Sequence, residues 1–172
     1  MIEVIKASLW SQFGACIDTL TQIIDLVPAS DWEVNTRYFY IAYHTTVMLD
    51  YYLTIPPAHF SASLPYTIMQ AHEVPPGVIG DMVPRRLYTK IELLDYISHA
   101  RDKCRKLING LSVENLNDRF IEEFDDPDAM DYNIIEVLLY NMRHVQHHAA
   151  QLNLMLRQDA NIAAGWVFRS DD

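Results

Sequence analysis

The side chains best suited to chemistry are histidines, and three of them lie close together in the string RHVQHH at positions 143–148. His144 and His148 are four positions apart, so on a helix they project from one face, one turn apart. Two imidazoles at this spacing can bind a single metal ion. A helical wheel places an apolar arc beside the pair and Arg143 and Gln146 opposite it. We therefore expect the pair to point into a helical core, where it needs hydrogen-bond partners or a cation.

His44 is a candidate third ligand, and it lies in a tyrosine-rich segment far away in the sequence. Its helical neighbours Tyr40, Met48 and Tyr51 form a mostly apolar stripe. A single histidine on such a stripe is more often a core residue than a ligand. An inward-facing pair on another helix changes this, because three neutral imidazoles supply the protein ligands of a metal site that keeps an open position. From the residues alone, a metal site and a hydrogen-bonded histidine cluster both remain open.

Other catalytic patterns are missing from the sequence. There is no His-Glu-x-x-His string, because Val145 follows His144 and the pair His72-Glu73 lacks a second histidine at the required distance. The chain has neither a glycine-rich phosphate loop nor a Gly-x-Ser-x-Gly nucleophile elbow. Carboxylates are scarce on the predicted apolar faces, so a di-iron carboxylate site is not expected.

Four long segments of helical periodicity must position these histidines. They are expected at about 2–26, from after Asp31 to about 54, from after Thr89 to 109, and from near Asp131 to about 158. Thr89 and Asp131 are candidate N-caps, and Asn109-Gly110 is typical of a helix end. The buried stripe of the first segment is predicted at steps of three or four, as Leu9, Phe13, Ile17, Leu20 and Ile24.

The connections between these segments differ in length. The first is short, whereas residues 55–88 contain six prolines and form a loop long enough to be functional. This crossover, with His59, Phe60, Tyr66 and His72, could form the mouth of a site or simply pack over the helices. We predict one all-α domain over 1–172, a four-helix bundle of up-down-down-up topology with the long crossover between helices two and three. The acidic stretch 122–128 is predicted to be a solvated loop.

Charge and composition narrow the function classes. With 13 Lys plus Arg against 23 Asp plus Glu, the net charge is −10, so nucleic-acid binding is not expected. No apolar run is long enough to cross a membrane, and no targeting signal is visible, so we expect a cytoplasmic protein. Cys16 and Cys104 are expected to be buried structural thiols. Cys104 is the better candidate for a reactive thiol, because basic neighbours lower a thiol pKa.

The last predicted helix also resembles a known family. The string YNMRHVQHHAAQL at 140–152, followed by Leu156-Arg157, is similar to the last-helix motif His-x-x-His-His-Arg-Gly-Gln of the DinB-like (YfiT-like) metalloenzyme superfamily. The tyrosine-rich segment around His44 resembles that family's second helix, which carries a single histidine ligand. The resemblance implies a four-helix up-down-down-up bundle with metal ligands at His44, His144 and His148. Here Ala149-Ala150 stands where the family often has Arg-Gly.

The resemblance also implies a class of chemistry. Characterised members of that family include thiol S-transferases and a thiol-dependent isomerase, and others are described as hydrolases. The resemblance therefore implies a divalent Zn, Ni or Fe ion and a small-molecule substrate, with a low-molecular-weight thiol as a candidate cosubstrate. Tyr40, Tyr51 and Gln151 are the polar groups expected nearest the metal, with His147 a weaker candidate. The alternative is a non-catalytic helical bundle that binds metal or a ligand in a stress response. A homodimer is compatible with either.

Overall fold

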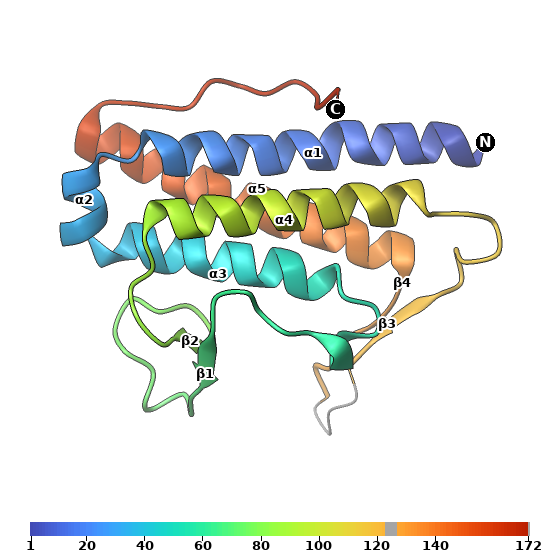
Figure 1. Cartoon of the computed structure of the whole chain (residues 1–172), viewed down its shortest axis with the longest axis horizontal. Coiled ribbons are helices and arrows are strands. Elements are labelled where there is room, and N and C mark those ends of the chain that lie inside the picture. The colour runs from blue at the N-terminus through green and yellow to red at the C-terminus, as the bar shows by residue number, and fades with distance from the viewer. Residues whose placement is uncertain (123–126, 172) are drawn as a thin grey trace.

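The computed structural model describes residues 1–122 and 127–171, and it is mostly helical, which agrees with the predicted all-α class (Figure 1). Within this part of the chain the strands are short and belong to two hairpins. Its α-helices are α1 (Ile2–Leu26), α2 (Ala29–Val34), α3 (Thr36–Tyr52), α4 (Lys90–Asn109) and α5 (Ile134–Ala160).

The helix boundaries follow the prediction in two cases and depart from it in two. Helix α1 matches, and α4 begins directly after Thr89, whose side chain forms a capping box with Glu92. The single helix predicted from after Asp31 to about 54 is instead divided, because Asn35 leaves the helical conformation and its side chain caps α3 by accepting from the Arg37 backbone N–H. Helix α5 is capped by Asn133, not by Asp131, which lies in a strand.

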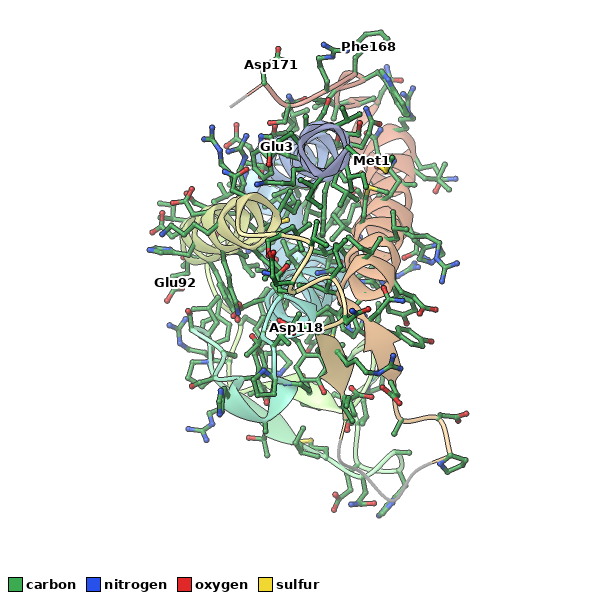
Figure 2. The ribbon with its side chains drawn as sticks, turned by 90° about the vertical axis from the view of Figure 1, so that its right-hand side faces the viewer. Met1, Glu3, Glu92, Asp118, Phe168 and Asp171 are labelled. Carbon is green, nitrogen blue, oxygen red and sulfur yellow. The ribbon has the colours of Figure 1, made fainter. Side chains whose placement is uncertain are left out.

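The four long helices pack around one apolar core. Helix α1 packs on α4 and α5, and α3 packs on the same two helices, as Figures 1 and 2 show from the side and nearly end-on. The stripe predicted for α1 is buried throughout. Burying such a stripe is the main stabilising contribution for an amphipathic helix, at about 1.5–3 kcal/mol for each large side chain.

Two buried polar contacts fix α3 against its neighbours. The Nδ2 of Asn141, a fully buried residue of α5, donates to the backbone oxygen of Leu49 at 2.9 Å. On the other side, the carboxylate of Asp50 accepts from Tyr96 at 2.8 Å and from Lys103 at 2.5 Å, both on α4. Because buried polar groups are costly when unpaired, these contacts favour one register of α3 between α4 and α5.

The crossover after α3 contains a short 3₁₀-helix, η1 (Pro57–His59), and an antiparallel pair of strands, β1 (Tyr66–Ile68) and β2 (Met82–Pro84), in which Tyr66 lies opposite Pro84. A second hairpin, β3 (Arg119–Ile121) with β4 (Asp131–Asn133), precedes α5. Figure 1 shows both hairpins below the helices, on the α3 side, whereas the C-terminal segment runs along α1 on the opposite side.

Three other expectations about the chain can be compared with the structure. No helix in residues 1–122 or 127–171 is long and apolar enough to cross a membrane. Most of the acidic stretch 122–128 lies outside the described residues. The suggestion that Cys104 is the more reactive thiol is wrong, because Cys104 is fully buried and desolvation raises its pKa despite the nearby Arg101.

Candidate metal centre

The three predicted histidines come together between α3 and α5. His44 comes from the middle of α3, and His144 and His148 project from α5 one turn apart. One ring nitrogen from each lies within 4.8 Å of the other two, and the Nε2 atoms of His44 and His144 are 3.1 Å apart. His148 is 6% exposed, and the other two rings are half-buried. Residues separated by 100 positions thus form one cluster of nitrogen donors.

The surroundings of the cluster keep its rings neutral. Burial lowers the pKa of His44 to about 4, and the nearby His148 lowers it further, while a hydrogen bond with the Ile79 backbone opposes this shift. Burial also lowers the pKa of His144 to about 3, with the other histidines adding to the effect. The pKa of His148 is lowered too, chiefly by burial. Neutral imidazole is the form that binds a metal, so the cluster is in its ligating state at neutral pH without losing protons.

Neighbouring groups orient two of the three rings. The Nδ1 of His148 donates to the Oε1 of Gln151 at 2.8 Å, which leaves its Nε2 lone pair free. On the other helix, Ile79 hydrogen-bonds His44 through its backbone, and Gly80 packs on the same ring with a positive φ of 73°. A second hydrogen bond of this kind is the usual way in which proteins fix the tautomer and direction of a metal-binding histidine. The Nδ1 of His144 is buried and has no hydrogen-bond partner among the described residues.

The distances between the donor atoms fit a transition metal. Two nitrogens bound to a tetrahedral ion at about 2.0–2.1 Å lie about 3.3–3.4 Å apart. The Nε2 atoms of His44 and His144 are 3.1 Å apart, close to this separation, in a hydrogen bond whose donor depends on the tautomer; an ion would replace this contact with a small movement of the rings. An all-imidazole donor set suits Zn, Ni, Cu or Fe and is a poor match for Mg or Ca, which prefer oxygen ligands.

The other predicted site residues differ in whether they contact the histidine cluster. Gln151 contacts the cluster directly. His147 packs on His148, with ring centroids 5.0 Å apart, and is itself exposed. Tyr40 lies beside Gly77 of the crossover and meets the ring of Phe39 edge-on. Tyr51 is turned toward the second hairpin, where its hydroxyl donates to Glu122 at 2.6 Å. A role for Tyr40 or Tyr51 in substrate binding stays a prediction.

The sequence interpretation missed two residues that bear on the site. The ring of Tyr52 meets that of His144 edge-on at 5.9 Å, and it also contacts Tyr51 and Tyr140. Asn141, one turn before His144 on α5, fixes that helix to α3. An asparagine within an otherwise apolar helical stretch was the available signal for the latter. Tyr52 gave no comparable signal, because tyrosines are frequent along this helix.

The crossover covers part of the site. Its residues 77–80 lie against Tyr40 and His44, so this stretch belongs to the wall around the cluster. Phe60 and Tyr66 stack on each other, and Phe60 also meets Tyr51 edge-on. His59 and His72 are exposed. The glycines at 77 and 80, which both have positive φ, allow the backbone to approach these rings closely.

Comparisons of the chain with protein-family models, with curated proteins and with solved structures each return no match. A function for this chain therefore has to be inferred from the geometry of its site.

Proposed function

We propose that the chain binds a divalent transition metal through His44, His144 and His148, and that it is a metal-dependent enzyme acting on a small molecule. The observation that carries the proposal is the convergence of three neutral ring nitrogens within 4.8 Å, from two helices that are fixed to each other by Asn141. A buried set of unprotonated imidazoles is stabilised by a cation.

The reaction class that fits this donor set is thiol S-transfer or hydrolysis. A metal held by three imidazoles supplies a Lewis acid with an open position, which lowers the pKa of a bound water or cosubstrate thiol. The chain's own residues would orient the ligands through Gln151 and the Ile79 backbone, and the ring of Tyr52, which meets that of His144, would restrict water. The resemblance to the DinB-like superfamily supports the same reaction class. We also propose the up-down-down-up bundle of that superfamily, because the helix pairs in contact and the long crossover are compatible with it.

A non-catalytic metal-binding protein is the second candidate, and one observation favours it. Gln151 and Tyr52, which contact the cluster, are poor proton acceptors at neutral pH: an amide does not titrate, and the pKa of Tyr52 is raised far above its ordinary value by burial and by Tyr140. Neither of these two residues is therefore suited to act as a general base, so catalysis would rely mainly on the metal.

The metal is tested on protein purified without chelators and without a nickel column. We expect close to one equivalent of Zn, Ni or Fe by elemental analysis. For the apo-protein, metal at about a thousand times its Kd adds about 4 kcal/mol of stability, or about 8–16 °C in Tm for a chain of this size. His44→Ala should abolish this increase, whereas His99→Ala, which removes an exposed histidine of α4, should retain it. Less than a tenth of an equivalent, with no stabilisation by added Zn²⁺ or Ni²⁺, would refute metal binding.

Catalysis is tested separately on the metal-loaded protein. A chlorinated arene or an epoxide is offered with a low-molecular-weight thiol, and the thioether product is quantified. Turnover that requires metal and is lost in His44→Ala supports the transferase. Full metal occupancy with no turnover, or turnover unchanged in His44→Ala, would instead leave the non-catalytic binding protein as the better description.

A further inference from the structure

A groove on the far side of α5 from His44 is separate from the metal centre. It lies between α1, α5 and the C-terminal segment after α5, and its volume is about 760 Å³. Its floor is mostly apolar and includes Ala15, Leu139, Met142 and Ala150. Grooves of about 300–1,000 Å³ with apolar walls and few polar groups are typical of sites for small organic molecules.

The C-terminal segment, which forms the third wall of this groove, is held in place on both sides of Trp166. Before Trp166, the backbone N–H of Ala164 donates to Asn153 at 3.0 Å. After it, the Ser170 backbone N–H donates to the Ser11 oxygen at 2.9 Å, and the Ser170 hydroxyl accepts from Arg101 at 2.7 Å. Both Ala164 and Ser170 are buried, whereas Trp166 is 72% exposed. The segment therefore presents the indole of Trp166 on a fixed backbone, so the groove is formed before any ligand arrives.

Gly14 of α1 makes this attachment possible. A Cβ at this position would lie 2.6 Å from the Cβ of Ser170, closer than side chains approach each other. The absence of a side chain thus lets the C-terminal segment lie directly on α1, along which Figure 1 shows it running. In Figure 2, Phe168 and Asp171 lie at the outer edge of the molecule, above α1.

The charge in the groove is of one sign. Arg143 lines it, and none of its lining residues is an aspartate or glutamate. Within the described residues Arg143 forms no ion pair, and its guanidinium lies 5.4 Å from the ring centroid of Tyr140. The amides of Gln12 and Gln146 line the same groove. In a chain with a net charge of −10, an arginine that has no ion pair among the described residues and lies beside an apolar groove is a favourable position for an anion.

From this arrangement we propose that the groove between α1, α5 and the C-terminal segment binds a small monocarboxylate with an apolar body. Its carboxylate would pair with Arg143, for which a two-pronged contact is the favoured geometry, and its body would lie against Met142 and the indole of Trp166. The proposal goes beyond the metal site and does not depend on it. Among the lining residues, His147 packs on the proposed metal ligand His148.

The test uses 2-naphthoate as the probe and 2-naphthamide as its neutral counterpart, with binding to the metal-free protein measured by calorimetry. We expect naphthoate to bind at least about ten-fold more tightly than the amide, because a charge-assisted contact is lost in the amide. Arg143→Gln should remove this preference and leave the affinity for the amide unchanged. Trp166→Ala should weaken both compounds, and Arg37→Gln, an exposed arginine of α3, should change neither.

Gly14→Ala is a second, independent variant, because it displaces the wall without altering any lining residue. We expect it to weaken both compounds several-fold while the helical circular dichroism is retained. Equal binding of naphthoate and amide, a naphthoate affinity unchanged in Arg143→Gln, or no binding of either compound at millimolar concentration would overturn the proposal. A concentration-dependent dimer that protects Trp166 from quenching and excludes naphthoate would also overturn it, since a second copy would then occupy the groove. These outcomes do not involve metal, so they are distinguishable from failure of the metal site.

Discussion

The neutral state of the histidine cluster leads to a quantitative prediction about protons. When a metal binds a histidine that carries a proton, the proton is released, so the number released reports the pKa values of the ligands before binding. At pH 5, two histidines of ordinary pKa 6.5 would together carry about 1.9 protons. With the pKa of His44 at about 4 and that of His144 at about 3, these two rings carry about 0.1 proton instead.

His148 sets the upper limit of the expected number of protons released on Zn²⁺ binding. Its pKa is lowered as well, and it can contribute no more than one proton. Zn²⁺ binding at pH 5 should therefore release at most about 1.1 protons, compared with about 2.9 for three ordinary histidines. The physical cause is burial, which has already displaced the protons in the folded apo-protein.

The assay is isothermal titration of Zn²⁺ into apo-protein at pH 5, in two buffers whose enthalpies of ionisation differ. The difference between the observed heats, divided by the difference in ionisation enthalpy, gives the number of protons released. The variant His99→Ala should give the same number, because that histidine is exposed and lies on α4. A release of two or more protons would show that the rings are protonated before binding, and the reasoning from burial would be refuted.

Three further predictions concern stability and the groups around the cluster. The pKa of His44 in the folded protein lies below its unfolded value, so its contribution to stability is fully present above about pH 6.5 and is lost as the pH falls through about 4. In urea unfolding of the apo-protein, the loss of unfolding free energy between pH 7 and pH 4 should therefore be about 3 kcal/mol smaller in His44→Ala than in the wild type. An equal acid sensitivity of the variant and the wild type would contradict this. Asn141→Ala should lower the free energy of unfolding by about 1–3 kcal/mol at neutral pH, because the Leu49 carbonyl loses its side-chain donor, and an effect below about 0.5 kcal/mol would show that this contact does not hold α5 to α3. Gln151→Leu should weaken Zn²⁺ binding by about 10–100-fold in a competition titration while Tm of the apo-protein changes little, whereas an unchanged affinity would remove Gln151 from any role in orienting His148.

Apart from His44 on α3, which was predicted from its apolar stripe and from the resemblance, the parts of the site that the sequence predicted depend on a single helix. The spacing of His144 and His148 places both on one face of α5 whatever the rest of the chain does. Gln151 follows three residues after His148, so their contact is also decided within one helix. The start of α4 at Thr89 was predictable for the same reason, because the capping box involves only Thr89 and Glu92.

The parts that the sequence did not predict depend on how two helices pack. Tyr51 was chosen because it lies in line with His44 on α3, seven positions along. The residue that meets His144 is instead Tyr52, which is turned by about 100° from Tyr51 on the same helix. Which of the two faces α5 is set by the rotation of α3, and that rotation is fixed by contacts such as Asn141 with Leu49 that join distant parts of the chain. The break at Asn35 has a related cause, since a side chain that caps the helix competes with continuing it.

Burial shifts the pKa values of both the cysteines and the candidate metal-binding histidines of this protein. Basic neighbours in the sequence favoured a reactive Cys104, but its position in the core raises its pKa, and partial burial raises that of Cys16 to about 11. The same desolvation lowers the pKa of His44 and His144, which makes them better metal ligands at neutral pH. A thiolate nucleophile supplied by either cysteine is therefore disfavoured. If the reaction is a thiol transfer, the thiol must come from a cosubstrate that reaches the metal, which is the outcome that the thioether assay measures.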